Sequence, residues 1–295
     1  MMKAYHIKSN CYEHYAFDFF SVADMREYIA TMPMGTLYAA QHKGPSSQQT
    51  DSSYARFAGS ASYDAAEKML DYGCPEIAEK LAKIACKAQK IELKSAFVRQ
   101  QAGFVPVVAS WLCGDPQSML AVKRQRRQAR VIDVYFCIDF NCKISAAEII
   151  RSQSRGLSVV RALEESGLRA NLWAMMCCHK TLRGGKDLEF AYYIRLKKAE
   201  EKLNVLKLSY PLCHPSFLRR HSFALLERTA AANVPEFVDG YGACISNDDL
   251  IDFVKKTKKI GENAIILPAE VNSKTFYDFL KKQNCEFAEK VLTNF

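Results

Sequence analysis

The sequence predicts an α/β or α+β fold in which helices cover a mixed sheet. Three apolar runs have the length and the hydrophobic pattern of buried strands, namely residues 131–138, 170–178 and 188–196. Helical patterns and turn residues lie between and around these runs. Strands that alternate with helices in this way are typical of a sheet protein with helical layers.

Residues 1–122 are expected to form an N-terminal αβ region. A helix is predicted after Ser21, because Ser21 and Asp24 are spaced as an N-cap and its third residue. Residues 42–53 contain no apolar side chain that could anchor them, so we expect a flexible loop there. Two helices should follow this loop, and Pro75 opens the second of them.

In the centre of the chain, the sequence excludes one segment as a central strand and marks the start of one helix. Residues 103–108 cannot be a central strand, because Pro106 has no N–H to donate to a neighbouring strand. The helix after the strand at 131–138 should begin at Ser145, since Glu148 follows three residues later as in a capping box.

Residues 123–295 are expected to form a basic α/β region. The glycine-rich turn at 183–187 predicts that the strands on either side of it form a hairpin. Further elements are expected at 216–232 (helix), after Ser246 (helix), at 264–267 (strand) and from Ser273 (helix). Because no long linker separates the two regions, they are also compatible with one compact domain.

Positive charge is concentrated in the middle of the chain. The net charge is zero over residues 1–122, +11 over residues 123–230 and −2 over residues 231–295. The excess begins with five cations in the eight residues 123–130. Phosphate groups are the most abundant polyanions that could screen such a cluster, so we expect a nucleic-acid-binding protein. The alternative is a solvated basic face.

Binding a single strand without reading its sequence requires cations for the phosphates and aromatic rings for the bases. Tyr54 and Phe57, with Arg56 between them, follow the expected loop and are predicted to stack on bases. The alternative for each ring is a place in the core. The cations expected to hold phosphates are Lys123, Arg124, Arg126, Arg127, Arg130, Arg183, Lys186, Arg219 and Arg220.

The sequence lacks the signatures of the common enzyme classes. There is no G-x-G-x-x-G, no G-x-x-x-x-G-K-[ST], no G-x-S-x-G and no H-E-x-x-H, so we expect no enzyme, no catalytic residue and no cofactor. Cysteine–histidine pairs at 177–179 and 213–214 lack a C-x-x-C partner, so we expect no metal. Eleven scattered cysteines, and the lack of a secretory signal or a long apolar run, lead us to expect a cytoplasmic protein without a membrane partner.

Residues 131–143, with the helix and strand that follow, resemble the opening βαβ unit of a von Willebrand factor A domain. In that family a D-x-S-x-S turn binds magnesium; here Asp139 matches, whereas Asn141 and Lys143 replace the two serines. The resemblance implies a degenerate von Willebrand A-like core with an N-terminal αβ extension. The corresponding function would be a protein-interaction module whose basic face binds an acidic partner.

A second resemblance rests on the turns at 103–106 and 114–119, the basic run, the strand at 131 and the helix opening at 214–220. These segments resemble the single-stranded-DNA-binding transcription cofactors of podophages that carry a virion RNA polymerase (the Drc type). The resemblance implies cooperative, largely sequence-independent binding of single-stranded DNA in the host bacterial cytoplasm, with self-association on the DNA. It also implies a cofactor role in phage transcription or replication, with a phage RNA polymerase as partner.

A third class is an enzyme that processes nucleic acid, such as a nuclease. It would need clustered carboxylates for magnesium. Asp133 and Asp139 are six residues apart on one predicted strand, or roughly 20 Å, which is too far for both to hold one ion.

Overall fold

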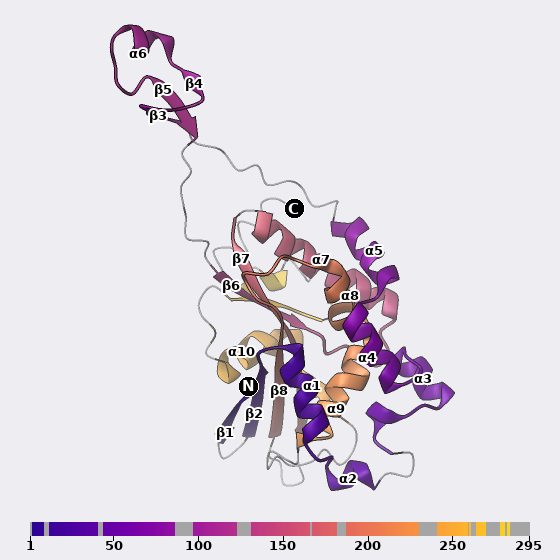
Figure 1. Ribbon diagram of the computed structural model, residues 1–295. Helices are drawn as coiled ribbons and strands as arrows, with labels where there is room; N and C mark the ends of the chain where they lie inside the picture. Colours follow the sequence, from indigo (N-terminus) through magenta and orange to yellow (C-terminus); the bar gives the residue numbers. More distant parts are fainter. Residues whose placement is uncertain are drawn as a thin grey trace.

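A mixed sheet lies at the centre of the computed structural model (Figure 1). The structure describes residues 2–8, 12–40, 44–85, 97–122, 131–165, 167–181, 187–229, 241–258, 260, 264–269, 278–280 and 282–283. Six of the seven described strands of this sheet follow the order β1-β2-β8-β7-β6-β10, and the seventh, β9, pairs with β7 at Cys178 and His179. They are β1 (Lys3–Lys8), β2 (Tyr12–Phe19), β6 (Val131–Cys137), β7 (Arg169–Thr181), β8 (Asp187–Lys197), β9 (Ala243–Cys244) and β10 (Ile265–Leu267).

The strand directions confirm the predicted mixed sheet and the predicted hairpin. β6 runs parallel to β7 and to β10, β7 and β8 pair antiparallel, and β8 runs parallel to β2. β1 pairs antiparallel with β2 at the edge. As a result, β6 and β7 begin at the same end of the sheet at which β2 and β8 finish. Cations at these strand termini are therefore brought together.

The helices begin where the caps predict. The Oγ atoms of Ser21 and Ser145 accept hydrogen bonds from backbone N–H groups three residues later, at 3.0 and 3.3 Å, and Ser246 does the same. The helices beside the main sheet are α1 (Val22–Thr31), α2 (Thr36–Ala39), α3 (Ser52–Ala58), α4 (Tyr63–Tyr72), α5 (Pro75–Ala85), α7 (Ala146–Glu165), α8 (Val205–Cys213), α9 (Phe223–Leu226) and α10 (Asn247–Thr257), with a 3-10 turn at Ser46–Gln48 and a π-helical turn at Phe217–Ser222.

Helices cover both faces of the main sheet. On one face α10 packs on the strands, and the Tyr193 hydroxyl lies 2.5 Å from the Thr257 Oγ1. On the other face α1 and α7 pack on the sheet, and α5 and α8 contact α7 (Figure 1). α7 comes so close to β6 that a Cβ atom on Gly156 would lie 2.7 Å from the Phe136 ring. The core therefore lies on both sides of a buried sheet.

Residues 97–122 form a second, small sheet. Its strands β3 (Phe97–Gln100), β5 (Met119–Val122) and β4 (Val105–Pro106) follow the order β3-β5-β4, and a short helix α6 (Val108–Leu112) follows β4. The prediction that Pro106 excludes a central strand is confirmed, since β4 is an edge strand. Residues 97–122 therefore form a sheet whose strands pair only with one another among the described residues.

Candidate nucleic-acid interface

Only part of the predicted site falls on residues that the structure describes. The basic run 123–130 and the turn residues Arg183 and Lys186 lie outside them, and their contact with nucleic acid stays a prediction. Tyr54, Arg56 and Phe57 lie on α3, where Arg56 is exposed. The two remaining arginines, Arg219 and Arg220, lie in the π-helical turn.

The structure brings the predicted rings and arginines together, but it pairs them with each other. The Arg219 guanidinium carbon lies 4.2 Å from the Phe57 ring centroid, and that of Arg220 lies 4.9 Å from the Tyr54 centroid. Arg219 is 6% exposed and Arg220 is 0% exposed. The expectation that these two arginines offer their charge at the surface is therefore wrong, and the rings of Tyr54 and Phe57 each have a guanidinium on one face.

Arg220 also anchors the segment that was expected to be a flexible loop. Its guanidinium donates to the carbonyl oxygens of Ser47 at 2.9 Å and Ser60 at 2.8 Å, and to that of Gln49. The Glu227 carboxylate accepts from the Ser47 backbone N–H at 2.9 Å. The flexible-loop prediction is wrong for the described residues 44–53, because a buried cation and a buried carboxylate from far along the chain bind their backbone.

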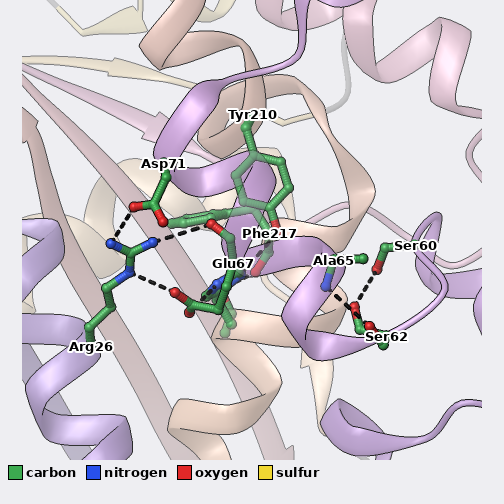
Figure 2. A network of polar contacts seen from close by, with 10 residues as sticks. Arg26, Ser60, Ser62, Ala65, Glu67, Asp71, Tyr210 and Phe217 are labelled. Atoms are coloured by element: carbon green, nitrogen blue, oxygen red, sulfur yellow. Dashed lines mark hydrogen bonds and ion pairs between the residues drawn. The ribbon is translucent and has the colours of Figure 1, made fainter.

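The same π-helical turn supplies the buried end of a polar network that reaches the exposed Asp71 (Figure 2). The two ring nitrogens of His221 lie 3.0 Å from the Tyr210 hydroxyl and 2.9 Å from a Glu67 carboxylate oxygen. Figure 2 shows Arg26 between Glu67 and Asp71, with ion-pair distances of 2.8 and 2.6 Å. Burial lowers the pKa of His221. This network joins α1, α4, α8 and the turn, and we interpret it as structural.

Two adjoining hollows lie at the end of the main sheet where β6 and β7 begin and β8 finishes. Their volumes are about 670 and 400 Å³, and Arg195 and Lys198 line both. Arg169 adds a cation to the larger hollow, and Lys207 adds one to the smaller. These four residues, Arg169, Arg195, Lys198 and Lys207, are called the basic sheet end below.

Arg195 is the structural centre of the basic sheet end. Its Nε donates to the carbonyl oxygen of Phe20 at 2.9 Å. Its guanidinium carbon lies 5.5 Å from the Phe20 ring centroid and 5.6 Å from that of Trp173. These contacts hold the half-buried Arg195 side chain in place. Arg195 forms no ion pair with another described residue. A planar cation fixed in this way is suited to forked contact with a phosphate.

The charges around the hollows leave an excess of cations. Lys197 also lines the smaller hollow, but it is buried and lies 2.7 Å from the Glu164 carboxylate. Asp71 is bound to a guanidinium of α1, which leaves Glu200 and Glu201 as the other acidic lining residues. Arg169, Lys198 and Lys207 are exposed and form no ion pair with a described residue. Such a surface attracts anions.

The predicted basic run joins the sheet at this surface. Val131, the first residue of β6, lines the larger hollow, and Arg130 directly precedes it in the chain. Sequence reasoning missed the basic sheet end because its four residues are scattered along the chain. The positions of two of these residues could have indicated the surface. Arg169 is the first residue of a strand and Lys198 directly follows a strand, and the termini of neighbouring strands lie close together in a sheet.

Residues 5–286 match a protein family that is described as a domain of unknown function, DUF7192. The chain belongs to this family. No curated protein and no solved structure matches it. Across the described part of this DUF7192 chain, no three His, Cys, Asp or Glu side chains lie close enough to hold a metal ion. No described helix has both the length and the apolar character that crossing a membrane requires.

Proposed function

We propose that the chain binds single-stranded DNA along the basic sheet end without reading its sequence. The observation that carries the proposal is the position of Val131, which directly follows the basic run 123–130 in the sequence and lines a hollow together with Arg169, Arg195 and Lys198. Contacts from lysine and arginine to phosphates supply affinity that does not depend on sequence. The run and the sheet end together offer cations enough to follow several phosphates.

The preference for a single strand rests on two further observations. The sequence has no helix-turn-helix, zinc-finger or basic-zipper pattern, so the usual scaffolds for reading a duplex groove are not recognisable in it. One hollow is lined by Arg195, whose guanidinium is held against the Phe20 ring, and a cation fixed on a concave surface suits the exposed phosphates of a single strand. A cofactor role in phage transcription or replication extends the proposal on the strength of the resemblance alone.

The first test compares a labelled thirty-base oligonucleotide with its duplex by fluorescence anisotropy, at about 50 and about 200 mM salt. We expect tight, salt-sensitive binding with a clear preference for the single strand. Absence of binding to both would refute the proposal. Equal binding to both would refute the preference for the single strand.

A matched pair of variants tests the location. Arg169→Ala, Lys198→Ala and Lys207→Ala together should lower the log–log salt slope by up to about 2, at about 0.7 per lost contact on single strands. Arg195 is left in place because it packs on two rings. The control removes three exposed cations elsewhere, Lys80, Lys143 and Arg151. An equal loss in both variants would show that only net charge matters, and an unchanged slope in the first would exclude the sheet end.

A further inference from the structure

The small sheet exposes large apolar side chains on one surface. Val108, Trp111 and Leu112 are exposed and lie three and four residues apart on α6, so they share one face of that helix. Phe104 and Val105, just before α6, are exposed as well. A concentration of exposed apolar residues on so small a unit marks a surface that another molecule covers.

The backbone holds this apolar surface in place. The Phe104 N–H donates to the carbonyl oxygen of Leu120 at 2.9 Å, and the Val107 N–H donates to that of Ser118 at 2.7 Å. A Cβ atom on Gly103 would lie 2.1 Å from the Leu120 oxygen, so only glycine allows this close approach. The backbone before α6 is therefore tied to β5, which reduces the entropy that a ligand would have to remove.

Basic segments flank the small sheet in the sequence, and the sheet brings their attachment points together. Phe97 pairs with Val122, so the chain enters and leaves the unit at the same end. Within residues 97–122 one cation and one acid balance each other. The flanking cations are Lys87, Lys90, Lys94, Lys123, Arg124, Arg126, Arg127 and Arg130. An apolar surface between two such segments suits a ligand that has flat apolar groups on a chain of negative charges.

We propose that Trp111 stacks on bases of the strand whose phosphates the flanking basic segments hold. This inference rests on the proposed function and supplies the base-binding half of the same site. It replaces Tyr54 and Phe57, which carry guanidinium groups on one face of their rings. Unpaired bases fit because every base offers a π-face to an exposed ring, and the phosphates next to it meet the cations.

The intrinsic fluorescence of the protein provides the test. The chain has two tryptophans, Trp111 at 65% exposed and Trp173 at 5% exposed. Titration with a thirty-base thymidine oligonucleotide should quench the emission of the wild type, and Trp111→Phe should lose this quenching. An abasic oligonucleotide of equal length carries the same phosphates, and it should bind with little quenching.

Two neighbouring variants separate stacking from general apolar contact. We expect Trp111→Ala to weaken binding of the thymidine oligonucleotide about 10-fold, as for the loss of one stacked base. Leu112→Ala removes a 72% exposed side chain from the same helix face, and it should change binding less than about 2-fold. Equal losses in the two variants would overturn the inference.

The remaining outcomes distinguish this inference from the proposed function. Tight anisotropy-detected binding with unchanged Trp111 emission would overturn the stacking inference and leave the proposed function intact. Absence of any binding would refute both the stacking inference and the proposed function. A shift of Trp111 emission with protein concentration alone, or with phosphatidylserine vesicles in place of DNA, would assign the apolar surface to a second copy or to a lipid surface and overturn the inference.

Discussion

Arg220 is fully buried, and its guanidinium donates to backbone carbonyls of Ser47 and Ser60. Arg169, by contrast, is exposed and has no acidic partner among the described residues. The two side chains have the same charge and the same donors, but their surroundings assign them different roles. A guanidinium bound by carbonyl oxygens stabilises the fold, whereas an unpaired one on a concave surface is available to a phosphate.

Replacing Arg220 by methionine should lower the free energy of unfolding by about 3 kcal/mol, because buried carbonyl oxygens lose their donors. Urea denaturation measures this loss. Arg56→Met, on the exposed side of α3, is the control and should stay within about 0.5 kcal/mol of the wild type. Similar stability of the two variants would contradict the anchoring role of Arg220.

The fold should also lose stability in mild acid through His214. Burial lowers the pKa of this ring to about 4, and its Nδ1 accepts from the Ser216 N–H at 3.2 Å. The unfolded chain takes up this proton near pH 6.5 but the folded protein does so only near pH 4, so stability falls as the pH falls between these values.

This contribution is at most about 3 kcal/mol. Asparagine at position 214 retains an acceptor but does not titrate. His214→Asn should therefore flatten the dependence of unfolding free energy on pH between about 4 and 6.5. Parallel urea titrations at several pH values measure the difference, and curves of equal steepness would refute the assignment.

Among the elements, α7 depends on its close approach to the sheet. The helix covers β6 and β10 where Gly156 faces Phe136 and Leu267, with no room for a Cβ atom. Helix propensity alone favours alanine over glycine by about 1 kcal/mol. The contact with the sheet opposes that preference, because the buried ring of Phe136 has little freedom to move.

Gly156→Ala should therefore destabilise the protein by about 1–3 kcal/mol despite the gain in propensity. Thermal or urea unfolding provides the measurement. Adding Phe136→Leu to this variant makes room for the new methyl group, so the double variant should lose less than the two separate losses combined. If the losses in unfolding free energy were strictly additive, or if Gly156→Ala were more stable than the wild type, the contact between Gly156 and Phe136 would not limit the size of the side chain at position 156.

Over the whole molecule, the positive charge gathers along a connected part of the chain. The basic run 123–130 follows β5 of the small sheet and precedes β6 of the main sheet. On the proposed function, one strand of DNA contacts the exposed Trp111 ring, the run and the basic sheet end in turn. The proposed function and the stacking inference describe two parts of this single path.

Replacing Arg124, Arg126 and Arg127 together by alanine should weaken binding to all sequences alike and lower the salt slope by about 2. Combining these changes with the three at the basic sheet end should lower the slope further, by about 4 in all. Anisotropy titrations over a series of salt concentrations measure both slopes. A combined variant no different from either triple would argue against a continuous path.

The caps at Ser21 and Ser145, the β7–β8 hairpin and the edge position of Pro106 followed from the sequence, because each depends on residues that are close along the chain. The rings and arginines of the predicted site could be named but not placed. Arg220 meets carbonyl groups more than 150 residues away, and only the folded chain decides whether a cation finds such partners. The basic sheet end likewise depends on which strands become neighbours, and that is set by long-range packing of the core.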